Sequence, residues 1–172
     1  LRSGAKVNDD IYITGTIGGA RAALLMNKRS FGYKYFEKNL KNPQPRVDVG
    51  LDLSKYANSC IDISDGIAKD LKCICDDSKK GFIVNIDSIP RRVHFEKYVK
   101  KSQYEECLLG GGEDYELCFT APSKFRRQIQ DISKKHKTKI TKIGVITNKS
   151  CKYMSNSKEI SISSRGYDHF KI

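Results

Sequence analysis

Residues 60–75 read Cys-Ile-Asp-Ile-Ser-Asp-Gly-Ile-Ala-Lys-Asp-Leu-Lys-Cys-Ile-Cys and place a short apolar strand directly before a helix. The strand is expected over residues 60–63. Helical spacing then follows in Ile67, Leu71, Ile74 and Cys75. Ser64 or Asp65 is expected to cap this helix, because both residue types accept hydrogen bonds from free amides at helix starts. An acidic, glycine-flanked turn therefore lies where a strand meets a helix.

Strands and helices alternate on both sides of this stretch. Upstream, residues 10–15 predict a strand, and a glycine turn leads into a helix with its apolar face over residues 22–26. A proline-rich breaker at residues 42–46 precedes a helical pattern over residues 47–58. Downstream, the pattern predicts strands over 81–86, 114–120 and 139–147, a helix over 123–136 and a short terminal pairing.

Length and composition favour one α/β domain. At 172 residues, the chain can bury a sizeable core without disulfides or metals. Its apolar fraction of 38% and charged fraction of 30% are those of a soluble globular protein rather than a disordered or membrane one. No apolar stretch approaches the roughly 18 residues that span a bilayer. Residues 1–10 carry charges where a signal peptide needs an apolar region, so we expect a cytoplasmic protein without a membrane partner.

Cysteine spacing and the spread of positive charge argue against a zinc protein and a nucleic-acid-binding protein. The six cysteines form no Cys-x-x-Cys pair with a matching partner, which argues against zinc and for reduced, packed thiols in the cytosol. The net charge of +12 suggests nucleic acid as a partner, but the lysines are spread out without interleaved aromatic residues. A solvated basic surface is therefore favoured, and its field would raise the encounter rate with phosphorylated substrates and nucleotides.

Asp62 and Asp65 are candidate metal ligands. A tight turn at the strand end would bring both carboxylates to one cation, while Ser64 offers a hydroxyl and an amide. Mg²⁺ suits such a site, because it takes one or two carboxylates and completes its shell with waters and substrate phosphates. The alternative is purely structural, with Asp65 as a helix cap and Asp62 as a turn residue, and spacing alone leaves both interpretations open.

A second acidic segment follows a run of glycines. Residues 110–117 read Gly-Gly-Gly-Glu-Asp-Tyr-Glu-Leu. Consecutive glycines cost backbone entropy unless the chain needs unusual dihedrals or close approach, and a ligand is the simplest reason for either. The alternative is a flexible loop with Glu113 and Asp114 in solvent. The chain lacks a Walker A loop, and residues 14–20 do not complete the dinucleotide fingerprint.

Seven segments in this order resemble the carboxyl-terminal half of the thiamine-monophosphate kinase family, within the aminoimidazole ribonucleotide synthase-like superfamily. They are residues 2–6, 14–18, 43–46, 61–66, 111–117, 143–144 and 166–170. The resemblance implies an α/β (α+β) layered domain, in which helices flank a mixed sheet. It also implies that residues 1–172 form one carboxyl-terminal domain of a longer protein. The amino-terminal domain, which binds ATP and metal and mediates dimerisation, has no counterpart in these residues.

The resemblance further implies transfer of the γ-phosphoryl group of ATP to thiamine monophosphate, with Mg²⁺. The implied site residues are the metal ligands Asp62 and Asp65, the ATP contacts Ser64 and Arg2, and the thiamine monophosphate contacts Glu113 and Tyr167. No catalytic residue is assigned. The acceptor phosphate has a second pKa of about 6 and needs no strong general base. We therefore expect direct in-line transfer, with cations offsetting the repulsion between the two polyanions.

Two other functions compete with this one. The first alternative is another ATP-using member of the superfamily, such as a relative of selenophosphate synthase or aminoimidazole ribonucleotide synthase, and substrate profiling would reveal it. The second alternative is a basic domain that binds nucleic acid or a partner, and salt-sensitive binding would reveal it. If the resemblance holds, we expect a homodimer at full length and little or no kinase activity from this chain alone.

Overall fold

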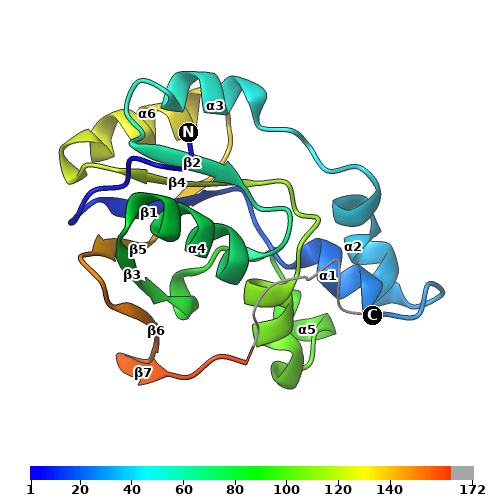
Figure 1. Ribbon diagram of the computed structural model, residues 1–172. Coiled ribbons are helices and arrows are strands. Elements are labelled where there is room, and N and C mark those ends of the chain that lie inside the picture. Colours follow the sequence, from blue (N-terminus) through cyan, green and yellow to red (C-terminus); the bar gives the residue numbers. More distant parts are fainter. Residues whose placement is uncertain (164–172) are drawn as a thin grey trace.

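The computed structural model describes residues 1–163, and within them the chain forms one seven-stranded sheet (Figure 1). The strands are β1 (Asp10–Thr14), β2 (Ser59–Asp62), β3 (Gly81–Asn85), β4 (Leu117–Ala121), β5 (Ile140–Thr147), β6 (Cys151–Ser155) and β7 (Lys158–Ile160). Their order across the sheet is β2-β4-β1-β5-β3-β6-β7. Every neighbouring pair is antiparallel except β3 and β6, which run parallel, so the sheet is mixed as expected.

Helices accompany the sheet throughout the described residues. They are α1 (Gly19–Leu24), α2 (Phe31–Lys41), α3 (Val47–Leu53), α4 (Ile67–Ser78), α5 (Phe95–Tyr98) and α6 (Arg126–Lys135). Shorter turns are η1 (Ile86–Ser88), η2 (Lys101–Gln103), η3 (Glu106–Gly110) and η4 (Ser123–Phe125). None of the helices among residues 1–163 is both long and apolar enough to cross a bilayer. All six cysteines are free thiols, and only Cys151 is exposed.

The helices cover both faces of the sheet. In Figure 1, α3 and α6 lie above the sheet and α4 lies below it. Side chains alternate along β1 as a strand requires, so that Tyr12 packs under α3 and α6 while Ile11 and Ile13 pack on the opposite side with α4. The ring of Tyr12 stacks on Phe119 of β4 at 5.1 Å. The expected layered fold, a mixed sheet flanked by helices, is confirmed.

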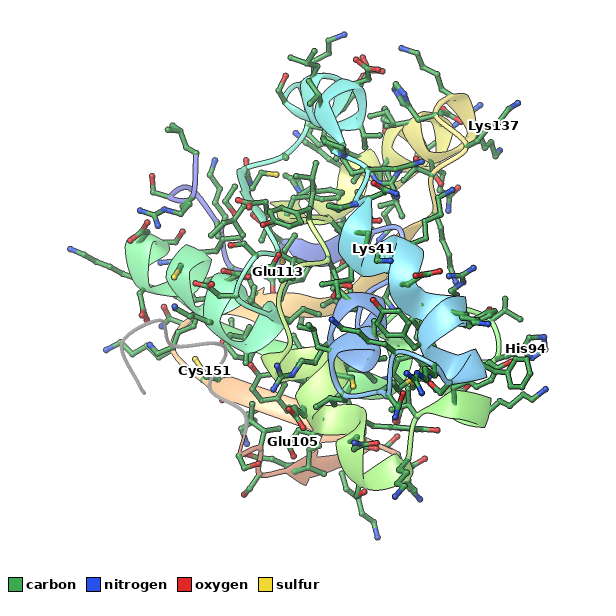
Figure 2. The ribbon with its side chains drawn as sticks, turned by 90° about the vertical axis from the view of Figure 1, so that its right-hand side faces the viewer. Lys41, His94, Glu105, Glu113, Lys137 and Cys151 are labelled. Atoms are coloured by element: carbon green, nitrogen blue, oxygen red, sulfur yellow. The ribbon has the colours of Figure 1, made fainter. Side chains whose placement is uncertain are left out.

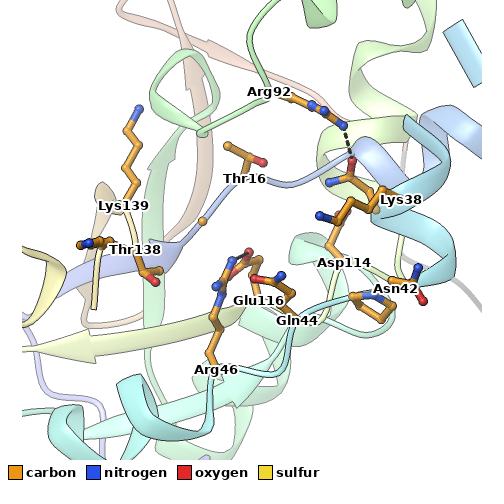
Figure 3. Close-up of a pocket in the computed structure, with 14 residues that line it drawn as sticks. Thr16, Lys38, Asn42, Gln44, Arg46, Arg92, Asp114, Glu116, Thr138 and Lys139 are labelled. Carbon is orange, nitrogen blue, oxygen red and sulfur yellow. Dashed lines mark hydrogen bonds and ion pairs between the residues drawn. The ribbon is translucent and has the colours of Figure 1, made fainter. Parts of the chain in front are cut away.

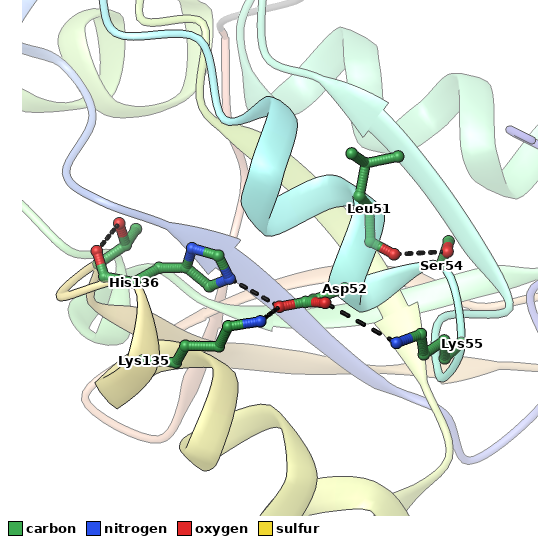
Figure 4. A network of polar contacts seen from close by, with 7 residues as sticks. Leu51, Asp52, Ser54, Lys55, Lys135 and His136 are labelled. Atoms are coloured by element: carbon green, nitrogen blue, oxygen red, sulfur yellow. Dashed lines mark hydrogen bonds and ion pairs between the residues drawn. The ribbon is translucent and has the colours of Figure 1, made fainter.

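A carboxylate connects the two helices of the upper layer. Asp52 of α3 accepts a hydrogen bond from Lys135 at 2.6 Å, and its Oδ2 lies 2.8 Å from Nε2 of His136, directly after α6 (Figure 4). These hydrogen bonds lower the pKa of Asp52 to about 2. The contact joins segments that lie far apart in the sequence.

Two predicted boundaries are corrected, and one helix is added. The helix expected over residues 47–58 ends at Leu53, because the chain turns there and the amide of Asn58 already pairs with Thr120. The strand expected from residue 114 begins at Leu117. Helix α2 was not predicted, although Ser30 caps it by accepting a hydrogen bond from the amide of Tyr33.

Candidate functional site

Four strand ends meet at one edge of the sheet. The register pairs Asp62, the last residue of β2, with Leu117, the first residue of β4. It also pairs Thr14 at the end of β1 with Ile140 at the start of β5. Since β1 lies between β4 and β5, the acidic turn, the glycine run and the loop after β1 all leave the sheet at this edge.

Asp70 of α4 fixes the acidic turn. Its Oδ2 accepts hydrogen bonds from the amides of Ser64, Asp65 and Gly66, each at 3.0 Å. Burial raises the pKa of Asp70 to about 6, although these backbone hydrogen bonds favour the ionised form. The predicted cap was wrong: neither Ser64 nor Asp65 caps α4, whose N-cap is Gly66 with a φ of 106°. A carboxylate inside the helix replaces the expected cap by reaching back to the turn.

The glycine run lets this turn and the second acidic segment come together. The amide of Glu113 donates to the carbonyl oxygen of Ser64 at 3.0 Å, and the amide of Tyr115 donates to that of Ile63, also at 3.0 Å. A Cβ added at Gly112 would overlap the carbonyl oxygen of Ser64. Gly112 therefore serves close approach to the chain's own backbone, and the two acidic motifs form a single unit.

Residues 113–116 alternate in exposure although they are not a strand. Glu113 and Tyr115 are exposed and have left-handed backbones, with φ values of 71° and 51°. Asp114 and Glu116 are buried. Asp114 accepts hydrogen bonds from the amides of Gly18 at 2.7 Å and Ala20 at 3.3 Å, and burial raises its pKa to about 7. The interpretation that Asp114 lies in solvent is wrong.

Glu116 joins three segments of the chain. Its carboxylate accepts hydrogen bonds from Thr14 Oγ1 at 2.6 Å and from Arg46, with Nε at 2.8 Å and Nη2 at 2.6 Å. The hydroxyl of Thr14 accepts in turn from the amide of Leu117 at 2.8 Å. The hydrogen bonds from Arg46 to Glu116 raise the pKa of Arg46 further above its usual range. The side chains of Arg46 and Glu116 are only 20% and 8% exposed, so the ion pair is largely shielded from water.

Three carboxylates gather on the exposed side of the unit. The hydroxyl of Tyr115 donates to Glu113 at 3.3 Å, and its pKa is raised by the charge of Glu113, by burial, and by the charges of Asp62 and Asp65. Asp65 also pairs with Lys69 at 2.7 Å. The structure thus brings together four of the predicted site residues, namely Asp62, Ser64, Asp65 and Glu113. Figure 2 shows Glu113 near the middle of this side of the molecule.

The turn fits a hard cation that keeps most of its shell for water or phosphate. Asp62 is exposed and Asp65 is partly exposed, so both carboxylates are accessible. No group of three or more His, Cys, Asp or Glu side chains arranged to hold a metal occurs among residues 1–163. Two carboxylates from one turn are nevertheless the number that Mg²⁺ commonly takes from protein when phosphates supply the rest.

Of the two remaining predicted residues only Arg2 is among the described residues, and it does not join this group. Arg2 is exposed and pairs with Asp77 at 3.3 Å, near the end of α4. Since Ile67 and Asp77 are ten helical steps apart, the helix rise separates them by about 15 Å. Arg2 therefore lies at the opposite end of α4 from the acidic turn, and its role stays a prediction. Tyr167 lies outside the described residues.

Sequence reasoning missed the residues that support the site. They are Thr14, Arg46, Asp70, Asp114 and Glu116. All but Asp70 lie inside the segments that carry the family resemblance. Their position therefore indicated that they matter, but the sequence did not indicate which contacts they make. An acidic residue in the first helical turn was the signal for Asp70.

Comparison with known families bears directly on this arrangement. The profile described as AIR synthase related protein, C-terminal domain, matches residues 6–154. The chain belongs to this family. The matched part of the AIR synthase related domain contains the acidic turn, the glycine run and the Arg46–Glu116 pair. The resemblance inferred from the seven segments is therefore confirmed.

Curated proteins similar to this chain are identical to it at about a third of the aligned residues. Thiamine-monophosphate kinase of Buchnera aphidicola subsp. Acyrthosiphon pisum is 38% identical over 178 residues, covering 99% of this chain and 55% of the relative. Thiamine-monophosphate kinase of Escherichia coli (strain K12) is 35% identical over 178 residues, covering 98% and 54%. The chain spans about half the length of the curated relatives it matches.

Solved structures share the fold of the AIR synthase related domain. Thiamine-monophosphate kinase from Stenotrophomonas maltophilia K279a superposes with a TM-score of 0.82 at 30% identity, covering 92% of this chain and 53% of that one. The structure described as "AaThiL complexed with AMPPCP and TMP" gives 0.78 at 25% identity, covering 98% and 53%.

Proposed function

We propose that this chain is the carboxyl-terminal part of an enzyme that transfers the γ-phosphoryl group of ATP to thiamine monophosphate. The observation that carries the proposal is the acidic unit at the sheet edge. Asp70 and the glycine run hold Asp62, Asp65 and Glu113 on one accessible surface. The curated relatives named thiamine-monophosphate kinases, and the relative with AMPPCP and TMP bound, support the choice of donor and acceptor.

Within this proposal, Ser64 contacts ATP through its hydroxyl. Its amide is already bonded to Asp70 and its carbonyl oxygen to the amide of Glu113, so only the side chain is left for a ligand. The turn itself is held by three hydrogen bonds from one carboxylate. A fixed turn orients the nucleotide without ordering costs at the moment of binding, which is how positioning accelerates a transfer between two bound groups.

Asp62 and Asp65 would hold Mg²⁺. Bound there, the ion would offset the repulsion between donor and acceptor phosphates, which amounts to roughly 4 kcal/mol for two unit charges 4 Å apart at an effective dielectric constant of 20. Lys69 stands at Asp65 in the structure, so this carboxylate already pairs with a cation. The protein needs no general base, because the acceptor phosphate is mostly ionised near neutral pH.

Glu113 and Tyr167 would contact the acceptor. The exposed carboxylate of Glu113 is suited to accept a hydrogen bond from the aminopyrimidine or to balance the charge of the thiazolium. Stacking of Tyr167 on either ring would contribute roughly 0.5 to 2 kcal/mol. Arg2 would contact ATP only in an arrangement that releases it from Asp77.

The remaining machinery is proposed to come from outside these residues. The curated relatives are nearly twice as long, so a further domain would complete the metal and nucleotide contacts and form the homodimer, in the cytoplasm. We expect the 172 residues alone to show little or no turnover. Robust kinase activity of the chain by itself would contradict this point.

A thermal-shift series tests the function. The protein, expressed at the full length that its gene encodes, is heated with thiamine monophosphate, a non-hydrolysable ATP analogue and Mg²⁺, separately and together. Thiamine monophosphate is expected to raise the melting temperature in proportion to the logarithm of its concentration, because it binds only the folded state. Thiamine, which lacks the phosphate, is the matched control. Stabilisation by substrates of other superfamily members, or by nucleic acid in a salt-sensitive way, would overturn the proposal.

A further inference from the structure

A cavity opens at the same edge of the sheet as the acidic unit. It measures about 420 Å³ and lies among the loop after β1, the end of α2, the segment that leads into α3 and residues 137–139 (Figure 3). Small-molecule sites in proteins commonly enclose roughly 300 to 1,000 Å³. The cavity is therefore large enough for a ligand, and the proposed kinase chemistry makes no use of it.

The walls of this cavity carry an excess of positive charge. The cationic lining residues are Lys38, Arg46, Arg92, Lys137 and Lys139. Its two carboxylates are already engaged, Asp114 with the amides that begin α1 and Glu116 with Thr14 and Arg46. Apart from Arg46, none of the lining cations forms an ion pair with a carboxylate within the described part of the chain.

The side chain of one of these cations, Arg92, is held in place. The guanidinium of Arg92 donates hydrogen bonds to the carbonyl oxygen of Tyr35 at 2.5 Å and to Asn39 at 3.0 Å, and it lies 4.1 Å from the centre of the Tyr35 ring. Lys137 has a left-handed backbone with φ 49°, a conformation that favours glycine or asparagine after a helix. Because like charges that converge repel each other, this arrangement is suited to an anion that offsets them.

The lining also disfavours one class of anion. Among residues 1–163 it contains no aromatic side chain, and its only apolar side chain there is that of Pro43. A purine, a pyrimidine or a thiazolium ring would therefore find only the guanidinium groups of Arg46 and Arg92 as flat surfaces, and no aromatic ring. The neutral lining side chains are hydroxyls and amides, such as Thr16, Asn42 and Gln44, which suit phosphate oxygens and hydroxyl groups.

We propose that this cavity binds a compact polyanion through two or more of its phosphate groups, inorganic pyrophosphate being the smallest example. Residues 113–116 separate the cavity from the acidic surface, because Asp114 and Glu116 line the cavity while Glu113 and Tyr115 are exposed. The cavity supplies its own cations and needs no divalent metal. Binding without a divalent metal therefore distinguishes the ligand of this cavity from a ligand held through Mg²⁺ at Asp62 and Asp65.

Calorimetric titration with sodium pyrophosphate in the presence of EDTA tests the proposal. The protein is used at the full length that its gene encodes, and EDTA removes any cation-assisted binding at the acidic turn. Pyrophosphate is expected to bind at least tenfold more tightly than orthophosphate, with an affinity that falls as salt is added. The double variant Lys38→Gln, Lys139→Gln is expected to lose at least tenfold in affinity.

The matched control is Lys149→Gln, Lys158→Gln, which removes the same charge from exposed positions outside the cavity. Pyrophosphate affinity that is unchanged in the first variant, or lowered equally in both, would overturn the proposal. All four lysines are exposed, so unchanged melting temperatures are expected to confirm that each variant folds.

Two further arms identify the source of the phosphates. If ATP in EDTA competes with pyrophosphate and binds the Lys38→Gln, Lys139→Gln variant less tightly, the cavity is assigned to the polyphosphate tail of a nucleotide. Pyrophosphate that binds without such competition assigns it to a free polyphosphate or a phosphorylated metabolite. A single-stranded oligonucleotide that displaces pyrophosphate at lower concentration than ATP would contradict a small-molecule site.

Discussion

The backbone amide of Glu113 lies 3.0 Å from the carbonyl oxygen of Ser64 and donates a hydrogen bond to it. This contact joins two acidic segments that are about fifty residues apart in the sequence and that looked like independent motifs. Gly112 permits it, because any side chain there would occupy the space of the Ser64 carbonyl group. The carboxylates on the accessible surface therefore depend on a glycine that itself contacts no ligand.

Replacement of Gly112 by alanine is expected to separate the two segments. The added methyl group meets backbone that has no free rotamer to adopt, and such overpacking typically costs about 1 to 3 kcal/mol of unfolding free energy. Urea denaturation of Gly112→Ala measures the loss. Gly50→Ala is the matched control, because its Cβ would lie at an ordinary 3.5 Å from Leu117 and alanine favours the helix. Equal stability of the two variants would contradict the close-approach explanation.

Loss of Arg46 is expected to destabilise the chain strongly. In Arg46→Met the carboxylate of Glu116 stays buried without its cation, a situation that typically costs about 3 to 5 kcal/mol. Adding Glu116→Gln removes the charge and is expected to restore part of the stability. The control Lys72→Met breaks the exposed pair with Asp76, which is worth at most about 1 kcal/mol. Thermal denaturation of the unchanged protein, Arg46→Met, the double variant and Lys72→Met measures whether burial of the Arg46–Glu116 pair determines the loss of stability.

The titration of Asp114 is expected to shape the pH dependence of stability. Its folded pKa of about 7 exceeds the ordinary value of 3.8, so between these values the folded state keeps a proton that the unfolded state releases. The contribution of Asp114 to stability therefore falls as pH rises from about 4 to about 7, by an amount on the order of a few kcal/mol.

Asp114→Asn removes this titration and is expected to flatten the curve of unfolding free energy against pH. Asp70, with a pKa raised to about 6, keeps a smaller slope of the same sign in the variant. The exposed Asp131→Asn is the control and is expected to leave the curve unchanged. Parallel curves for Asp114→Asn and the unchanged protein would show that Asp114 is ionised throughout.

The proposed division of the acidic unit predicts opposite effects of two substitutions. Glu113→Gln is expected to weaken thiamine monophosphate by roughly tenfold or more, the usual result of losing a hydrogen bond to a charged group, and to leave the ATP analogue unaffected. Asp65→Asn is expected to weaken the Mg²⁺-dependent binding of the ATP analogue instead. Calorimetry with each ligand measures both, and equal weakening of the two ligands by Glu113→Gln would count against its role.

Much of the sheet could be predicted from local pattern. Short apolar runs bounded by turn residues located β1, β3 and β5 to within one residue, because a strand covered on both faces reads as a nearly continuous apolar stretch. Helix α2 was missed although Tyr33, Phe36 and Leu40 show helical spacing behind a serine cap. The signal for α2 is therefore local, in the serine cap and in the spacing of these apolar residues.

The site was predictable in its members but not in its geometry. Asp62, Asp65 and Glu113 were identified, yet the burial of Asp114 and Glu116 depends on left-handed backbones at Glu113 and Tyr115. Those dihedrals are imposed by hydrogen bonds to Ile63 and Ser64, which are distant in sequence. The same holds for Asp70, because only the folded turn shows that one carboxylate holds three amides.

The pairing of strand β1 limits how early the sheet can fold while the chain is being synthesised. Strand β1 pairs with residues of β4 and β5, with Asp10 opposite Ala121 and Val145, so the centre of the sheet closes over more than a hundred residues of chain. Such long-range pairing is slow to form, and a chain emerging from the ribosome presents β1 and β2 as open edges until β4 has been made. The acidic turn can form locally around Asp70, but its union with the segment after the glycine run must wait until that segment and β4 have been made.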